Sequence, residues 1–376
     1  MNRPIYLDYA ATTPVSPEVL EAMIPYFSQH FGNSGSNQHL FGWEASDAVD
    51  QARKTISSYF SVNPSSILFT SGATESNNLA LLGLLEEQTP GHIISSPLEH
   101  KAVLEPLAYL AHKGWEITYL EPNSAGEICL EQIKTAKKSD TRLVSLMWVN
   151  NEIGVINDIS SIAQWCNQEG IYCHTDATQA LGKLDLSQAF LPDLLSFSGH
   201  KIFGPKGIGA LYVKSGIPLK ARQWGGAQER GLRAGTLPIP LIVGLAKAVE
   251  RIPHLLTFLP QIQVKKQDLE NSLKESLGDS LIVNSISENQ IPHILNFSIQ
   301  GVDWEKLFRC MPLLAFSNGS ACNSKSTFPS HVLKALGRDN DTALASIRIS
   351  LAQPYLNEDH DWVKDYLVKS LEKLIS

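Results

Sequence analysis

A lysine flanked by apolar residues is the first candidate for chemistry. Lys201 lies in residues 196–213, SFSGHKIFGPKGIGALYV, after His200 and before Ile202 and Phe203, with no acidic residue close by in the sequence. A partly desolvated ammonium is costly unless it is paired, neutralised or chemically bonded. Taken alone, the stretch favours a loop lysine whose amine extends to water. Other residues must therefore decide what this amine does.

A glycine turn in LFTSGATESNN is the second candidate. An apolar run ends at Gly72 and a helix is expected to begin near Ala73. Free helix N–H groups and the Thr74 hydroxyl would suit a phosphate. The alternative is an ordinary capped helix with Thr70 or Ser71 as its N-cap. The stretch alone favours the cap.

Two further apolar runs end in polar side chains. IYCHTDATQ ends at Asp176, with Gln179 three residues later, and LMWVNNEIGV ends at Asn150 and Asn151. A carboxylate at a strand end could keep a ring nitrogen protonated, or it could cap a helix. The two amides could bind a substrate carboxylate or organise a turn. In an open α/β sheet such strand ends gather around a ligand.

A phosphate cradle, a carboxylate for a ring nitrogen and an amine for a carbonyl together describe a pyridoxal phosphate site. A free lysine has a pKa of about 10.4, whereas desolvation and an aldehyde both favour the neutral, condensed form. Rival motifs are absent from the sequence. Lys183 is followed by Leu184, so no P-loop is present, and neither H-E-x-x-H nor a dinucleotide fingerprint occurs.

Two residues nearer the C-terminus complete the candidate set. Cys322 lies in FSNGSACNSKSTFPSHVL, which has the composition of a functional loop. A thiol with a pKa of about 8.5 needs a nearby base or cation to act as a nucleophile. The alternative is a passive surface cysteine. Arg348 lies in the apolar run SIRISL, where a guanidinium binds a planar anion, either a structural carboxylate or that of a substrate.

The elements that must position these residues alternate along the chain. From about Ile67 to Val213, seven short β-rich runs are interleaved with helical segments. This alternation predicts an α/β architecture with a mostly parallel central sheet and helices on both faces; an eight-stranded barrel is the alternative. After residue 252 the pattern changes to a long helix, further strands and a terminal helix, which predicts a smaller α+β domain.

The composition places limits on function. The chain has 376 residues, 43% of them apolar, and a net charge of −7, so neither nucleic acid nor an anionic membrane is an expected partner. The apolar stretches are too short to span a bilayer, and the first residues resemble no targeting segment. We therefore expect a cytoplasmic protein. Five cysteines without a C-x-x-C pair indicate free thiols and no metal site.

Many ordered motifs carry a family resemblance: YLDYAATTP, FGN, HLFGWEA, FTSGATESNNLA, EHKAV, VNNEIGV, DATQALGKL, SFSGHKIFGPKGIGALYV, ERGLRAGTLP, GSAC and SIRISL. In these the chain resembles the cysteine desulfurases, NifS/IscS-like pyridoxal phosphate enzymes of the class V aminotransferase superfamily. The resemblance implies a homodimer of fold type I. It also implies a large domain over residues 15–252, and a small domain over residues 1–14 and 253–376 that carries a catalytic loop at about 317–330.

The resemblance also implies roles for individual residues. Lys201 would be the Schiff-base lysine, Asp176 the partner of the pyridine nitrogen, and Gln179 a donor to the ring oxygen. His100 would stack on the ring and shuttle protons, and Cys322 would be the sulfur acceptor. The phosphate ligands would be Ala73, Thr74, Ser198, His200 and, from the partner subunit, Thr236; the residues that hold the substrate carboxylate would be Asn33, Asn151 and Arg348.

The implied reaction removes sulfur from L-cysteine, releases L-alanine and leaves a persulfide on Cys322. An acceptor protein would then take the sulfur, either an iron–sulfur scaffold or a thiolation relay. Ala227, Asn323 and Lys325 depart from residues common in the family and bear on the choice of acceptor. The alternatives are a selenocysteine lyase or another pyridoxal phosphate lyase or transaminase of the same fold, and a non-catalytic paralogue that binds partners in sulfur traffic.

Overall fold

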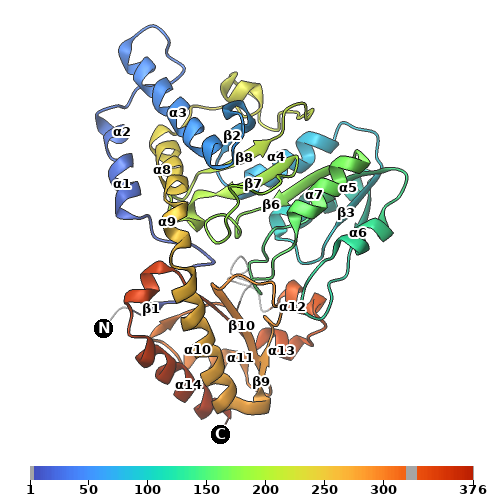
Figure 1. Cartoon of the computed structure of the whole chain (residues 1–376), viewed down its shortest axis with the longest axis vertical. Coiled ribbons are helices and arrows are strands. Elements are labelled where there is room, and N and C mark those ends of the chain that lie inside the picture. Colours follow the sequence, from blue (N-terminus) through green and yellow to red (C-terminus); the bar gives the residue numbers. More distant parts are fainter. Residues whose placement is uncertain (1–3, 319–327, 376) are drawn as a thin grey trace.

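An open seven-stranded sheet forms the centre of the computed structural model, which describes residues 4–318 and 328–375 (Figure 1). The strand order is β2-β8-β7-β6-β5-β3-β4. Only β8 runs antiparallel to its neighbours, so the other six strands share one direction. The strands are β2 (Ile67–Thr70), β3 (His92–Ser95), β4 (Glu116–Tyr119), β5 (Thr141–Ser145), β6 (Tyr172–Asp176), β7 (Leu194–Ser198) and β8 (Gly209–Val213).

The mostly parallel sheet predicted from the sequence is confirmed, and the barrel alternative is wrong because β2 and β4 remain as free edges. Each of the seven β-rich runs forms a strand. Strands of this kind are buried on both faces, which explains why the runs are almost continuously apolar.

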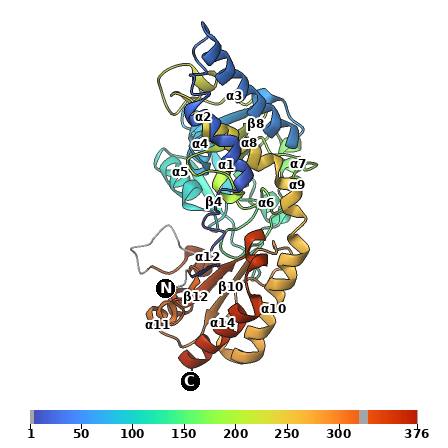
Figure 2. The same ribbon diagram turned by 90° about the vertical axis from the view of Figure 1, so that its left-hand side faces the viewer.

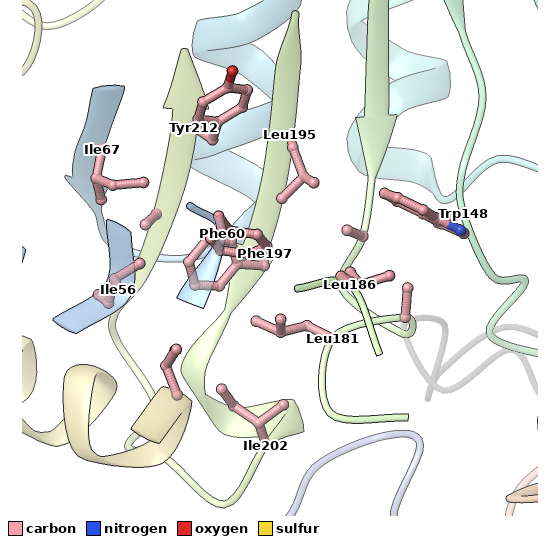
Figure 3. Close-up of a cluster of buried hydrophobic side chains, with 14 of the residues drawn as sticks. Ile56, Phe60, Ile67, Trp148, Leu181, Leu186, Leu195, Phe197, Ile202 and Tyr212 are labelled. Carbon is pink, nitrogen blue, oxygen red and sulfur yellow. The ribbon is translucent and has the colours of Figure 1, made fainter. Parts of the chain in front are cut away.

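Alternating side chains divide the sheet core into two layers. Ile67 and Phe69 point to one face, whereas Leu68 between them points to the other. Figure 3 shows the first layer, where Phe60 and Phe197 meet with ring centroids 5.8 Å apart. Helices therefore cover both faces, as the sequence predicted.

The helices of the first layer are α1 (Pro17–Met23), α3 (Leu40–Tyr59), α6 (Leu130–Ala136), α7 (Ile159–Glu169) and α8 (Ile239–Glu250), and those of the second layer are α4 (Ala73–Leu85) and α5 (Lys101–His112). Two short helices, α2 (Pro25–Ser28) and α9 (Ile252–Leu256), flank α1 and α8.

A second, smaller core brings both ends of the chain together (Figures 1 and 2). Leu7 and Tyr9 pack with side chains from Leu255 to Leu371 around a three-stranded antiparallel sheet in the order β12-β10-β9. This packing supports the predicted small domain, whose boundaries stay a prediction.

The strands of the smaller core are β1 (Ile5–Tyr6), β9 (Leu281–Val283), β10 (Ile294–Ile299), β11 (Leu314–Ala315) and β12 (Ser346–Ser350), and its helices are α10 (Leu259–Leu277), α11 (Trp304–Arg309), α12 (His331–Ala335), α13 (Asn340–Leu344) and α14 (His360–Ile375). Strand β1 pairs in parallel with β11. None of the helices within the described residues is long and apolar enough to cross a membrane.

Candidate active site

The shared strand direction places several polar strand ends at one edge of the central sheet. Thr70, Asp176 and Ser198 are the last residues of β2, β6 and β7. A cavity of about 880 Å³ opens at this edge, within the range of about 300–1,000 Å³ that is usual for small-molecule sites. Residues from β12 and from the start of α12 close it on the other side.

Most residues predicted from the sequence meet in this cavity. The lining includes Ala73, Thr74, His100, Asn151, Asp176, Gln179, Ser198, His200, Lys201 and Arg348. Asn33 and Thr236 are exposed and do not line it, so the roles assigned to them stay predictions. Cys322 lies outside the described residues.

The N-terminus of α4 is open toward the cavity. Its N-cap is Gly72, at φ +154°, and no side chain caps the helix. The predicted side-chain cap is therefore wrong. The Thr70 hydroxyl instead bonds the Ser76 hydroxyl at 2.8 Å. Since the first N–H groups of a helix have no partner within it, Ala73 and Thr74 offer donors at the cavity wall.

Glycine is required where β2 ends and β8 begins. A side chain at Gly209 would lie 2.7 Å from the Gly72 Cα atom and 2.5 Å from the Phe197 carbonyl oxygen. This close approach brings the start of α4 beside the end of β7, so that Thr74 and Ser198 line the same cavity.

The Asp176 carboxylate is fixed in position by two donors. Its Oδ2 atom accepts a hydrogen bond from Asn77 Nδ2 at 2.7 Å, and its Oδ1 atom accepts one from Thr178 N at 2.9 Å. Sequence reasoning missed Asn77. The signal was its position four residues after Ala73, which places both on the same face of α4.

The Lys201 amine is held by the start of the chain. Its Nζ atom donates to the carbonyl oxygens of Ala10 and Ala11 at 2.6 and 2.7 Å. The side chain is half-buried and lines the cavity, so the partial desolvation expected from the apolar flanks is present. The simpler interpretation, a lysine that extends to bulk water, is therefore wrong.

His200 is neutral at pH 7. Burial, reinforced by the positive charges of Lys201, Lys206 and Lys183, lowers the pKa of His200 to about 4. Its Nδ1 atom lies 3.1 Å from the Thr12 hydroxyl oxygen. A neutral imidazole keeps one N–H donor for an anion and adds no further positive charge beside these three lysines.

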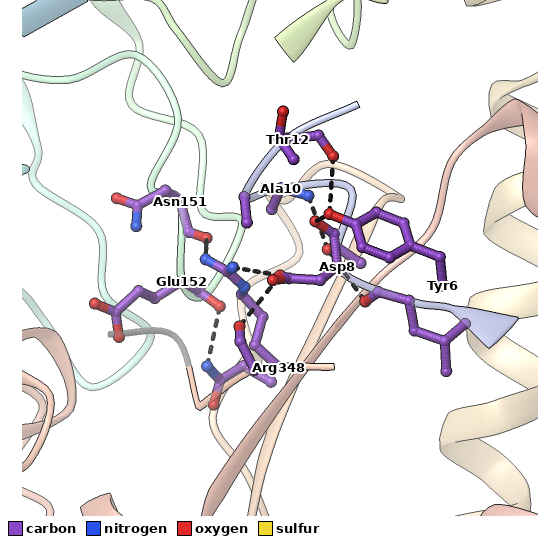
Figure 4. A network of polar contacts seen from close by, with 12 residues as sticks. Tyr6, Asp8, Ala10, Thr12, Asn151, Glu152 and Arg348 are labelled. Carbon is purple, nitrogen blue, oxygen red and sulfur yellow. Dashed lines mark hydrogen bonds and ion pairs between the residues drawn. The ribbon is translucent and has the colours of Figure 1, made fainter. Parts of the chain in front are cut away.

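Arg348 lies in a polar network that joins β12 to the start of the chain (Figure 4). Its Nη2 atom pairs with Asp8 Oδ1 at 2.6 Å, and its Nη1 atom donates to the Asn151 carbonyl oxygen at 2.9 Å. Its Nε atom has no hydrogen-bond partner among the described residues. The structural ion pair considered from the sequence is therefore present, on a side chain that also lines the cavity.

Two buried acids were also missed, Glu152, which lines the cavity, and Glu99, which precedes the lining residue His100. The Glu152 carboxylate accepts a hydrogen bond from the Ser330 hydroxyl, and Glu99 Oε1 accepts one from Met147 N at 2.6 Å. Burial raises the pKa of Glu152, and it raises that of Glu99 well above its ordinary value. No sequence signal distinguishes these two acids from surface glutamates.

Buried polar atoms without partners show whether the cavity fits a pyridoxal phosphate group. Thr178 Oγ1 and Gln179 Oε1 have no hydrogen-bond partner among the described residues, while Gln179 Nε2 donates to the Ala10 carbonyl oxygen at 2.8 Å. Buried polar atoms normally have partners. Together with the open end of α4 and the fixed Asp176 carboxylate, these atoms fit a ligand with phosphate, ring and hydroxyl groups.

Comparison with known proteins identifies the family of the chain. Residues 5–361 match the family model described as aminotransferase class-V. The cysteine desulfurase IscS of Salmonella paratyphi C is 46% identical over 383 aligned positions, which cover 100% of this chain and 94% of that protein.

Solved structures agree as well. A NifS-like protein superposes with a TM-score of 0.88 at 34% identity, over 99% of both chains. SspA in complex with cysteine superposes with a TM-score of 0.81 at 39% identity, over 93% of this chain and 99% of that one. The chain therefore belongs to the class-V aminotransferase family of enzymes, within the group of the IscS cysteine desulfurases.

Proposed function

We propose that the protein is a pyridoxal phosphate-dependent cysteine desulfurase, which takes sulfur from L-cysteine and releases L-alanine. The observation that carries the proposal is the meeting of Lys201, Asp176 and the open N-terminus of α4 in one cavity. The names of the relatives support the substrate, since IscS is a cysteine desulfurase and SspA was solved with cysteine.

In this proposal each wall of the cavity holds one part of the cofactor. Ala73 and Thr74 on α4, with Ser198 and neutral His200 beside them, bind the phosphate. Asp176 pairs with the protonated ring nitrogen, and Gln179 and His100 contact the ring. Lys201 attaches the cofactor through its amine. When bound, pyridoxal phosphate supplies an electron sink for the substrate α-carbon.

The remaining groups bind the substrate and move its protons. Arg348 and Asn151 hold the substrate carboxylate, with the Arg348 Nε donor still unpaired among the described residues. Lys201 Nζ would take the α-proton, because it lies in the cavity wall and can act as a general base when neutral. His100, which also lines the cavity, serves as a second proton carrier.

Cys322 is the proposed sulfur acceptor. Its thiolate attacks the substrate sulfur, so that a sulfur–sulfur bond forms and the carbon–sulfur bond of the substrate breaks. The electron pair and a proton go to the substrate carbon, which becomes the methyl group of alanine. The products balance as alanine and an enzyme persulfide, which passes its outer sulfur to an iron–sulfur scaffold or a thiolation relay in the cytoplasm.

A homodimer is part of the proposal. An apolar patch on α1, α2 and the start of α3 is exposed; its residues are Leu20, Ile24, Phe27, Phe31, Leu40, Phe41 and Trp43. Monomeric proteins rarely expose a patch of this kind. Asn33 lies within this segment, so a second copy seated on it would allow Asn33, and Thr236 from its own loop, to reach the partner's cavity.

The test supplies L-cysteine to the cofactor-loaded protein and measures alanine and reducible sulfide. The wild type should form both in equal amounts, and Cys322→Ala should lose desulfurase turnover. Full turnover by Cys322→Ala would exclude the persulfide route, and a wild type that forms no alanine would favour the partner-binding paralogue. Activity with selenocysteine but not with cysteine would instead identify a selenocysteine lyase.

A further inference from the structure

Lys201 and Ala10 line a second cavity as well as the active site. This cavity has a volume of about 20 Å³, which is room for one ligand of about the size of a water molecule. It lies where the central sheet meets the smaller core. Its other walls include Gly182 and Lys183, from the segment after β6, and His293, the residue before β10.

Lys183 contributes to the wall of this cavity. The residue is buried, and its Nζ atom has no hydrogen-bond partner among the described residues. Burial, together with the positive charge of Lys201, lowers the pKa of Lys183 to about 7. The amine is therefore still protonated in a substantial fraction of molecules at neutral pH, with nothing in the described structure to balance its charge.

His293 lines the same cavity and carries a second buried nitrogen, Nδ1, without a hydrogen-bond partner among the described residues. Burial, with the charges of Lys183 and Lys266, lowers the pKa of His293 well below its ordinary value. The neutral ring can present an N–H donor from Nδ1, so the cavity offers an ammonium and an imidazole donor to one ligand.

The charge of the lining determines what kind of ligand fits. The described lining contains no aspartate or glutamate; its ionisable groups are Tyr9, Lys183, Lys201 and His293. A water molecule would satisfy the hydrogen bonds but leave the buried charge uncompensated, whereas a monovalent anion would do both.

We propose that this cavity binds one small monovalent anion, with chloride as the probe, between Lys183 Nζ and His293 Nδ1. The site uses none of the residues that bind cofactor or substrate in the proposed function, apart from the shared wall at Lys201, and it does not rest on that function. Its ligand places a negative charge beside Lys201 and so contributes to the electrostatic environment of that amine.

Bromide gives a direct test, since it replaces chloride and scatters anomalously. Crystals of the cofactor-loaded wild type grown in sodium bromide should show an anomalous peak within hydrogen-bond reach of Lys183 Nζ and His293 Nδ1. Density that refines as water, with no anomalous signal at this position, would overturn the proposal.

Thermal unfolding gives an independent test in solution. Replacing gluconate by chloride at constant ionic strength should raise the wild-type Tm by about 1–3 °C at tenfold excess over Kd. The rise should be larger below pH 7 than well above it, because only protonated Lys183 attracts the anion. The other ionisable groups that act on this site are Lys201, His200 and Lys266, and their titration also contributes to the pH dependence of the Tm.

Two variants isolate the site. Lys183→Met should abolish the chloride-dependent rise in Tm, whereas Lys266→Met should retain most of it. Lys266 is the control for loss of a nearby buried charge: it is also a buried lysine without a hydrogen-bond partner among the described residues, and its charge acts on His293, but it does not line the cavity. An equal chloride effect in all three proteins would overturn the proposal. If Lys183→Met fails to fold, the bromide experiment on the wild type still decides.

Discussion

The Arg348 guanidinium and the Asp8 carboxylate form an ion pair of 2.6 Å that joins β12 to the start of the chain. Only 2% of the Arg348 side chain and 16% of the Asp8 side chain are exposed to solvent. Asp8 Oδ1 also accepts a hydrogen bond from Ser317 at 3.2 Å. The Asp8 carboxylate therefore holds two side chains in place: Arg348, a predicted substrate-binding residue, and Ser317.

Asp8→Ala should destabilise the fold strongly. Removing one partner of a buried ion pair leaves an uncompensated charge, which costs about 3–5 kcal/mol. Urea unfolding of both proteins measures this difference in the free energy of unfolding. Asp8→Asn, which retains an acceptor, should lose less than Asp8→Ala. A loss below about 1 kcal/mol for Asp8→Ala would show that the pair behaves as a surface contact.

Asn77→Ala should impair catalysis by loosening Asp176. Loss of an outer hydrogen bond that orients a site residue typically costs about 10–100-fold, so we expect a fall of that size in kcat/KM, together with weaker retention of the cofactor on dialysis. Asn78→Ala is the matched control, since Asn78 bonds the Thr74 carbonyl oxygen and not the carboxylate. Equal effects of the two substitutions would argue against a positioning role for Asn77.

Acid should destabilise the protein through His174. Burial lowers the pKa of this histidine from 6.5 to about 4, and both ring nitrogens contact serine hydroxyls, those of Ser145 and Ser196. Between these two pH values the unfolded chain binds a proton that the folded protein does not, so the folded state loses stability as the pH falls. The full difference corresponds to about 3 kcal/mol.

The measurement is urea unfolding of the wild type and His174→Gln from pH 7 to pH 4. The variant should lose less stability over this range than the wild type, even if it starts from a lower value. Parallel curves for the two proteins would exclude His174 as the group responsible.

Phe31→Glu should dissociate the proposed homodimer. The Phe31 and Phe41 rings pack against each other with centroids 5.4 Å apart, and their residues are 65% and 50% exposed. A buried carboxylate in this patch would oppose association. Analytical ultracentrifugation should show a dimer for the wild type and a monomer for the variant. Val264→Glu, an equally exposed position on α10, should remain dimeric, and a monomeric wild type would refute the proposal.

The strands and most of the cavity could be predicted from local patterns. The run ILFT alternates between two cores at Ile67, Leu68 and Phe69, which is the pattern of a strand buried on both faces. Because Asp176 and Ser198 end two such runs, the rule that strand ends gather around a ligand brought them to one site. The reversed direction of β8 was not predicted, although its signal was present: only residues 199–208 join β7 to β8, which is too short for the crossover that a parallel pair needs.

Other features depend on contacts that no local pattern encodes. The predicted cap of α4 failed because the Thr70 hydroxyl is engaged by Ser76, a contact that competes with capping. Asp8 and Arg348 are 340 residues apart in the sequence, so their pairing follows only from the folding of both chain ends into one core. Asn77 could have been found from helix periodicity, because it lies four residues after Ala73 and therefore on the same face of α4 as that predicted phosphate ligand.

The most direct measurement identifies the lysine that carries the cofactor. The protein reconstituted with pyridoxal phosphate is reduced with borohydride and digested, and the modified peptide is sequenced by mass spectrometry. The account predicts a visible absorbance band before reduction and a pyridoxyl group on Lys201 alone. A protein that gains no chromophore, or a label on Lys183 or Lys206 in place of Lys201, would contradict it.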